Sequence, residues 1–375
     1  MGKLRKLVQK MKFKFILEQL NPFLIRLSSR SISFGLSERF LLFQFLNQAS
    51  RKIEDNPYLN FVSIIKNYKV FGNILSGTMH DFYRDRNKSY FVNFFTSKEL
   101  YKIVKSDIER VHDINKDLKV TIFKEGFIIY DNYKTNQFNL FLLTCHSGTY
   151  ITPSIEKKML PTKEKRYSEE DIASDEIYSK LVLKQGGIWI DNKLSRYYCD
   201  VNRNISNCIY GKNRSTDKPD FWIKALTKAE EKKIHDVYRK FYFLLKNLLD
   251  TYKFNIILDG HTMKDKEGRT DISLGTHFIP KFYLPIVGSI SRKIKYMDYA
   301  SVGINKPFRG GFILEWMSIK FPSVFIFSME VNKKLYMTKN RLKILPKNVE
   351  KLADDMINIF DIVEDEGYRA PSNKS

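Results

Sequence analysis

Three apolar stretches of the sequence lead into side chains that can bind a metal or move a proton. His146 and His261 each follow an apolar run, and Glu330 stands near the end of a third, residues 325–331. In open α/β sheets, ligands bind beyond the carboxyl ends of the strands, so polar residues at these places are the ones to inspect. Two of the chain's six histidines therefore occupy equivalent positions, with a carboxylate in a comparable one.

Each of these side chains is a weak signal alone. A histidine after a strand is most often a hydrogen-bonded structural residue, and a glutamate at a strand end is usually a solvated rim charge. Together, two histidines and a carboxylate from elsewhere make up the ligand set of a catalytic zinc site, which keeps one position open for water. Such a water needs a base, and Glu330 is the candidate.

The elements that must position these side chains alternate between strands and helices. Apolar, β-branched and aromatic runs predict strands at 120–130, 138–144, 196–201, 254–258 and 324–331. Amphipathic spacing predicts helices at 97–114, 171–184, 227–249 and 349–362. Such alternation predicts an α/β fold with a mostly parallel or mixed central sheet and helices on both faces.

Six ordered segments resemble the motifs of one enzyme family, that of the N-formylglutamate amidohydrolases. They are HSG with a following proline (146–153), SRYYCDVNR (195–203), LDGHTM (258–263), DISLGT (271–276), FRGGFI (308–313) and SMEVNKKLYM (328–337). The resemblance covers about residues 120–365 and implies the phosphorylase/hydrolase-like scaffold of the zinc carboxypeptidases.

The resemblance also implies a divalent metal, usually Zn²⁺, held by His146, His261 and an acidic residue. The family pattern directs attention to the helix after the HSG loop, where Asp175 is the best candidate and Glu176 its rival. An alternative role for Asp175 is that of a helix N-terminal acid stabilised by the macrodipole.

Substrate contacts follow from the same resemblance. Glu330 would be the general base and Arg196 the group that polarises the scissile carbonyl. Asn202 and Arg203 would clamp a substrate carboxylate, although a surface salt bridge is the alternative for the arginines. The remaining candidates are Thr276 and Arg309 as pocket residues of lower weight, and Asp259 as a partner that orients His261.

The implied activity is hydrolysis of a small acidic acyl amino acid: N-formyl-L-glutamate and water would give formate and glutamate. One alternative keeps the scaffold and predicts a carboxypeptidase-like hydrolase of peptides. Another predicts a binding protein without catalysis that uses its basic N-terminal region.

The charge of the chain is unevenly distributed. About half of the formal net charge of +22 falls within residues 1–110, which raises nucleic acid or an anionic membrane as partners. No nucleic-acid-binding motif accompanies it, and abundant Asn, Ile, Tyr and Phe indicate a compositional bias instead. We expect a basic, mainly helical extension at 1–110, a catalytic domain at 111–365 and a disordered tail at 366–375.

Cysteine usage and hydropathy exclude several further classes. Three cysteines without CxxC spacing exclude a disulfide scaffold and a cysteine zinc motif. Cys145 adjoins His146, and neighbouring side chains of an extended chain point to opposite sides, so we expect a buried apolar role for it. No run is long and apolar enough to span a bilayer and no signal peptide is visible, which predicts a cytoplasmic protein.

Overall fold

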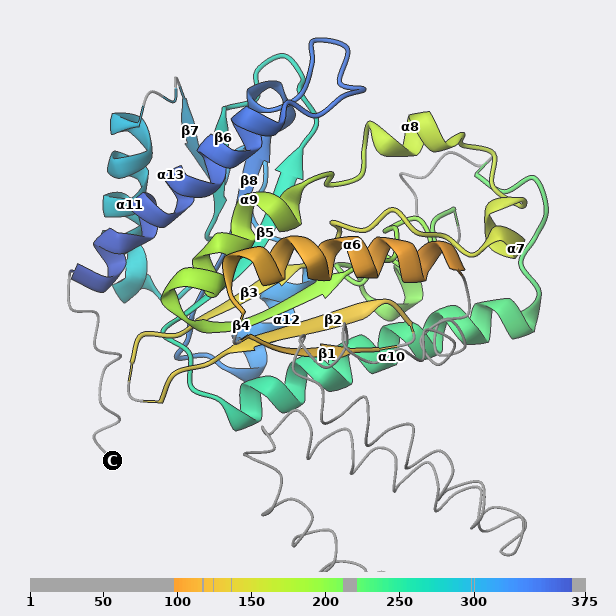
Figure 1. Ribbon diagram of the computed structural model, residues 1–375, viewed down its shortest axis with the longest axis horizontal. Helices are drawn as coiled ribbons and strands as arrows, with labels where there is room; N and C mark the ends of the chain where they lie inside the picture. The colour runs from red at the N-terminus through yellow and green to blue at the C-terminus, as the bar shows by residue number, and fades with distance from the viewer. Residues whose placement is uncertain are drawn as a thin grey trace, which may run out of the picture. The chain divides into compact units, whose positions relative to one another are not determined.

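The computed structural model describes residues 98–365, except 117, 124, 136, 212–220, 298 and 300 (Figure 1). All of them belong to the larger of the chain's two units, Thr78–Ser375. Nearly all of the expected N-terminal extension, with the nucleic-acid or membrane contacts considered for it, lies outside the described residues, as does the expected tail. Within the described part, no helix has the length and apolarity of a membrane span.

The described residues form one mixed sheet of eight strands in the order β1-β2-β4-β3-β5-β8-β6-β7. Strands β4, β3, β5 and β8 are mutually parallel, whereas β2 runs antiparallel to β4 and β6 runs antiparallel to β8. The predicted mixed sheet is therefore confirmed. The strands are β1 Lys119–Ile122, β2 Phe127–Asn132, β3 Leu140–Thr144, β4 Gly187–Asn192, β5 Ile256–Met263, β6 Ile272–Gly275, β7 Val302–Ile304 and β8 Phe325–Asn332.

Helices cover both faces of the sheet (Figure 1). One face carries α6 Lys98–Ile114, α9 Ser174–Lys180, α11 Leu284–Tyr296 and α13 Pro346–Asp365, and the other carries α10 Lys228–Thr251 and α12 Phe312–Lys320. The shorter helices are α7 Pro153–Glu156, α8 Lys163–Tyr167, η1 Leu181–Gln185, η2 Ile205–Asn207, η3 Lys281–Tyr283 and η4 Lys333–Leu335.

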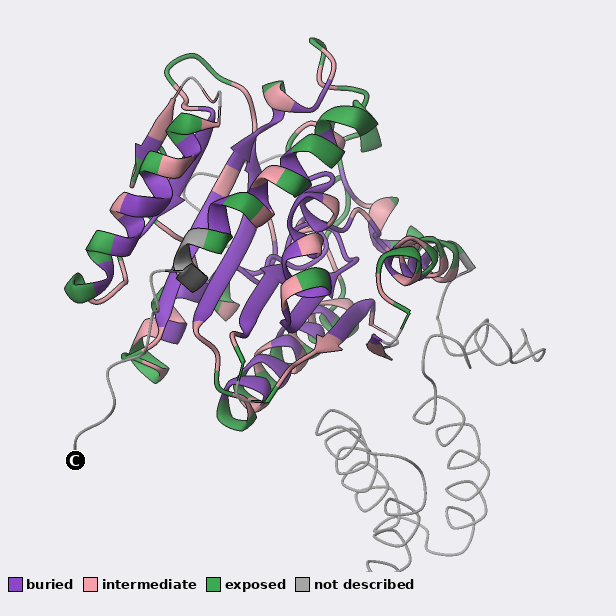
Figure 2. Ribbon diagram, turned by 60° about the vertical axis from the view of Figure 1, so that its left-hand side comes forward, coloured by how far each residue is buried: buried purple, intermediate pink, exposed green. Residues whose placement is uncertain are grey.

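The core lies on the two faces of the central strands. Every residue of β3, β4 and β5 is buried, as expected for parallel strands covered on both sides (Figure 2). The amphipathic helix α10 begins with a capping box, in which Thr227 and Glu230 satisfy each other's backbone N–H groups. A rigid, buried sheet of this kind fixes the strand ends that carry the candidate site.

Three local predictions differ from the structure. The expected strand at 120–130 is a hairpin, β1 and β2, because Gly126 takes the left-handed φ of 103° in its turn. The expected strand at 196–201 is a series of turns. The helix expected from 171 begins only at Ser174, because Ala173 adopts a left-handed φ of 63°.

Candidate active site

Three neighbouring parallel strands, β3, β5 and β8, bring together the residues that the sequence predicts to bind metal or transfer a proton. His146 lies in a turn just beyond β3, while His261 lies on β5 and Glu330 on β8. In the register of β5 and β8, His261 is directly paired with Glu330. All three side chains line one pocket of about 300 Å³.

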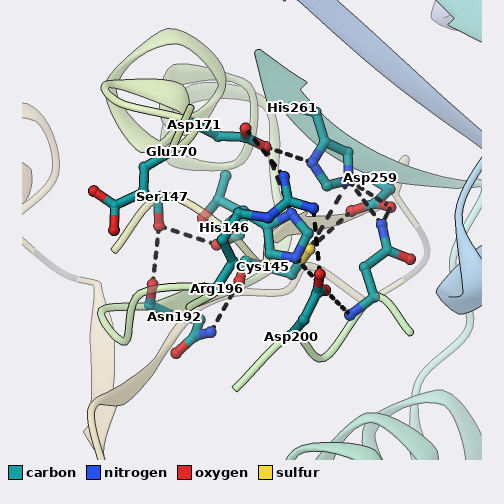
Figure 3. Close-up of polar contacts among 12 residues, drawn as sticks. Cys145, His146, Ser147, Glu170, Asp171, Asn192, Arg196, Asp200, Asp259 and His261 are labelled. Carbon is teal, nitrogen blue, oxygen red and sulfur yellow. Dashed lines mark hydrogen bonds and ion pairs between the residues drawn. The ribbon is translucent and has the colours of Figure 1, made fainter. Parts of the chain in front are cut away.

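Both histidines are oriented by buried carboxylates on one side of the ring (Figure 3). Nε2 of His146 lies 2.9 Å from Oδ1 of Asp200, and Nε2 of His261 lies 2.8 Å from Oδ2 of Asp259. The two ring centroids are 5.1 Å apart. Burial by itself would lower the pKa of His261, but Asp259 and its other neighbours raise that pKa well above the ordinary value. Asp259 therefore makes the contact with His261 that its expected orienting role requires.

A single carboxylate, Asp171, faces the other nitrogen of each ring. Oδ2 of Asp171 lies 2.7 Å from Nδ1 of His261 and 3.7 Å from Nδ1 of His146. Nδ1 of His146 is buried and has no hydrogen-bond partner. Burial would raise the pKa of Asp171, but its interactions with the two neighbouring histidines outweigh this and hold the pKa far below its usual range. Asp171 therefore lies near the Nδ1 atoms of both rings.

Asp175 and its rival Glu176 do not reach the histidines. The carboxylate of Asp175 instead lies 2.8 Å from the ammonium of Lys193 and 3.2 Å from the guanidinium of Arg110. The left-handed Ala173 separates the loop that carries Asp171 from α9, on which Asp175 and Glu176 lie. The place expected for Asp175 is therefore taken by Asp171, four residues earlier.

Asp175 belongs to a separate charged cluster that surrounds the ammonium of Lys193. Lys193 also contacts Asp107 of α6, at 2.7 Å, and Asp191 of β4. Asp191 in turn accepts a hydrogen bond from the Ser147 hydroxyl at 2.6 Å, so the cluster supports the turn that carries His146. Two cations, Lys193 and Arg110, already pair with the three carboxylates of this group, which favours a structural role for it over metal binding.

The loop that carries Asp171 is held from the end of β8. The buried ammonium of Lys333 donates to the carbonyl oxygens of Ser168, at 2.9 Å, and Glu170. The hydroxyl of Tyr336 donates to the carbonyl of Ile172 at 2.8 Å. Burial lowers the pKa of Lys333 to about 8, a value at which the ammonium still predominates at neutral pH. Backbone atoms on both sides of Asp171 are thus fixed by one short segment.

Two of the remaining candidates, Arg196 and Asn202, line the pocket and contact the residues around the histidines. The Arg196 guanidinium lies 3.3 Å from Asp200 and 3.9 Å from Asp171, so it bridges the carboxylates around the histidines. The Asn202 amide nitrogen lies 3.2 Å from Nε2 of His261, and its carbonyl accepts a hydrogen bond from the backbone N–H of Ile313. Asn202 therefore ties His261 to the FRGGFI segment.

A family model described as N-formylglutamate amidohydrolase matches residues 138–337, which is more than half of the chain. The chain belongs to the N-formylglutamate amidohydrolase family. It is thus a hydrolase that acts on amide bonds, as the resemblance implied. No curated protein matches the sequence.

Solved structures bear on the fold of this family member. The N-formylglutamate amidohydrolase from Ralstonia eutropha JMP134 is 17% identical, with a TM-score of 0.53 over 64% of this chain and 99% of that chain. Gene product Atu2144 from Agrobacterium tumefaciens is 14% identical, with a TM-score of 0.48 over 64% and 96% of the two chains. A metallo-carboxypeptidase from Burkholderia cenocepacia is 9% identical, with a TM-score of 0.37 over 73% and 70%. The first of these confirms the predicted α/β fold.

Of the residues expected to bind substrate, Thr276 and Arg309 do not line the pocket of this amidohydrolase, whereas Arg203 does. Thr276 is buried and its hydroxyl accepts a hydrogen bond from Asn305, while Arg309 is exposed and its carbonyl accepts one from the backbone N–H of His277. Neither is among the residues that line the pocket, whereas the exposed Arg203 is. Of the proposed substrate residues, only Arg203 and Asn202 are therefore positioned to meet a ligand there.

Cys145 is buried as expected, but its side chain does not point away from the site. Its sulfur lies 3.9 Å from Nε2 of His261 and 3.7 Å from Oδ1 of Asp259. Cys145 and His146 lie in a turn beyond β3, where the alternation of an extended chain no longer applies. The thiol thus packs on the Nε2 side of His261, whereas Asp171 faces Nδ1.

Proposed function

We propose that this family member is a metal-dependent amidohydrolase whose substrate is a small acidic acyl amino acid, with N-formyl-L-glutamate as the first candidate. The reaction would consume water and release formate and glutamate. One observation carries the proposal: two buried imidazoles, each anchored through Nε2 by a carboxylate, turn their Nδ1 atoms toward a third carboxylate.

The donor set fits a divalent metal such as Zn²⁺. Metal-binding histidines usually give their second ring nitrogen to a carboxylate, which fixes the tautomer and raises the basicity of the ligand. His146 and His261 each have such a partner, and Nδ1 of His146 lacks any hydrogen-bond partner although it is buried. We infer that His146, His261 and Asp171 would hold the metal.

The metal, when bound, would lower the pKa of a water and act as a Lewis acid toward the scissile carbonyl. Glu330 would take a proton from the attacking water and pass it to the leaving amine nitrogen. Burial raises the pKa of the Glu330 carboxyl to about 7, which suits a group that must both accept and release a proton near neutrality. Arg196 would stabilise the developing oxyanion, and Arg203 would bind a substrate carboxylate.

Removal of metal tests the proposal. We expect the purified protein to contain about one divalent ion per chain, and dialysis against a chelator to reduce formate release by more than about 100-fold, with recovery on adding Zn²⁺. Metal analysis and a formate assay on N-formyl-L-glutamate make the measurement. Full activity in protein free of metal would refute the proposed metal dependence. Bound metal without formate release would instead refute the proposed substrate.

Loosening the Asp171 loop should weaken metal binding without touching a ligand. In Lys333→Met, two carbonyl oxygens beside Asp171 lose their ammonium partner, and we expect metal affinity to fall about 10- to 100-fold. The adjacent Lys334, whose side chain is 37% exposed and pairs with Asp271, supplies the control variant Lys334→Met.

Metal dissociation constants are measured by competition with a chelating dye, at a temperature where circular dichroism shows both variants folded. Equal affinity in Lys333→Met and wild type would show that the loop keeps its geometry without the ammonium.

A further inference from the structure

The segment between β5 and β6 sorts its charges by sign. Residues 264–271 read KDKEGRTD, with acidic and basic side chains interleaved. The three basic side chains, Lys264, Lys266 and Arg269, all line the pocket, and none of the acidic ones does. Interleaved charges would ordinarily give a neutral surface, so this separation calls for a physical cause.

Two of the three acidic side chains of this segment, Asp265 and Asp271, are held by partners outside the pocket lining, and the third, Glu267, is exposed. Asp265 forms an ion pair with Arg341, and Asp271 forms one with Lys334 at 2.6 Å. Asp271 also accepts a hydrogen bond from the backbone N–H of Ser301 at 2.9 Å. With two of these carboxylates anchored elsewhere and Glu267 outside the pocket lining, the segment contributes only basic side chains to the pocket.

Arg269 is held in place rather than free in solvent. Its guanidinium donates to the carbonyl of Lys264 at 2.8 Å and lies 5.1 Å above the ring of Phe308, which also lines the pocket. A contact of this kind with an aromatic face orients the cation without neutralising it. The guanidinium therefore keeps donors for a ligand.

The charges of the two parts of the pocket differ. Near the histidines, Arg196 already faces Asp171 and Asp200. Among the described residues, the only carboxylate paired with the three basic side chains of the segment is Glu169, at 3.7 Å from Lys264, and that pair is 40% and 49% exposed. An anion bound between these cations would relieve their mutual repulsion.

We propose that Lys264, Lys266 and Arg269 form a second anion subsite, and that the preferred substrate carries a carboxylate beyond the two of N-formylglutamate. This inference rests on the proposed amidohydrolase function and specifies its substrate class: an acyl amino acid with three carboxylates. The added carboxylate lies either on a glutamyl residue joined to the amino acid or on the acyl group. The pocket volume of about 300 Å³ is that of sites for ligands larger than N-formylglutamate.

The test compares kcat/KM for N-formyl-L-glutamate with that for N-formyl-γ-L-glutamyl-L-glutamate and for N-succinyl-L-glutamate. We expect wild type to prefer at least one substrate with three carboxylates, and Lys266→Ala with Arg269→Ala to reduce that preference ratio about tenfold. Lys281→Ala, which removes an exposed lysine outside the pocket, should keep the ratio. A ratio near one in wild type, or a ratio unchanged in the double variant, would overturn the inference.

Calorimetric binding to Glu330→Gln protein separates this inference from the proposed function. If no substrate is hydrolysed, the proposed function fails, but tighter binding of the ligands with three carboxylates, lost in the double variant, would still support the subsite. If N-formyl-L-glutamate is hydrolysed and all three ligands bind equally, the subsite fails while the function stands.

Discussion

Glu330→Gln is expected to reduce hydrolysis about 10²- to 10⁴-fold, the usual contribution of a positioned general base. The amide keeps the size of the carboxylate but cannot accept the proton of the attacking water. Because Glu330 is paired with His261 in the sheet register and is not among the proposed ligands, we expect metal content to stay at the wild-type level. Formate release and metal analysis on the same sample measure both effects.

His261→Ala is the matched comparison, because it removes a proposed ligand on the neighbouring strand. We expect this variant to lose both metal and activity. Glu330→Gln protein that keeps more than about a tenth of wild-type activity would exclude Glu330 as the general base. Loss of metal in Glu330→Gln would instead place that carboxylate among the ligands.

Asp171→Asn and Asp175→Asn should separate metal binding from stability. Asp171 lies between the two histidines, so we expect Asp171→Asn to lower metal affinity by more than about 100-fold, beyond the effect of losing an outer partner. Asp175 instead contacts Lys193 and Arg110. Breaking this buried group should lower the free energy of unfolding by about 3 kcal/mol while the folded protein still binds metal.

Metal titration and urea unfolding of the metal-free proteins check both variants. The assignment of Asp171 would be overturned if Asp171→Asn bound metal normally while folded Asp175→Asn did not. In that case the loop would have to rearrange, since Asp175 faces Lys193 and not the histidines in this structure.

The parts of the site that lie on or just beyond strands could be predicted from the sequence. His146, His261 and Glu330 stand at the carboxyl ends of apolar runs, and parallel pairing of β3, β5 and β8 brings such ends together. Strand periodicity and chain order are local signals, so the mixed sheet and the position of these three residues follow from them.

The identity of the acidic residue beside the two histidines depends on a backbone feature that sequence periodicity does not reveal. Both Asp171 and Asp175 fit the expected helix, and only the left-handed backbone at Ala173 assigns them to different clusters. A non-glycine residue rarely takes this conformation, so nothing in the local sequence marked the break. The contact between Lys333 and the carbonyl of Glu170 fixes the loop that carries Asp171. Because these residues lie far apart in the chain, local sequence patterns do not reveal this contact.

The surroundings of residues outside helices and strands could also not be predicted from sequence patterns. Thr276 and Arg309 belong to segments that resemble family motifs, but neither side chain lines the pocket. The Thr276 hydroxyl is hydrogen-bonded to Asn305, and Arg309 is exposed to solvent. In the segment 264–271, the sequence shows only interleaved charge. Two of its three carboxylates are held outside the pocket lining by Arg341 and Lys334, which lie far along the chain.

Helix α6 belongs to the folded unit of this enzyme and contributes to its buried charged cluster. It runs without interruption from Lys98 to Ile114, across the boundary expected at residue 110, and contributes Asp107 and Arg110 to the cluster around Lys193. A fragment that started at residue 111 would keep every proposed metal ligand but leave Lys193 and Asp175 without these partners. Expression of a shortened enzyme should therefore start no later than Lys98.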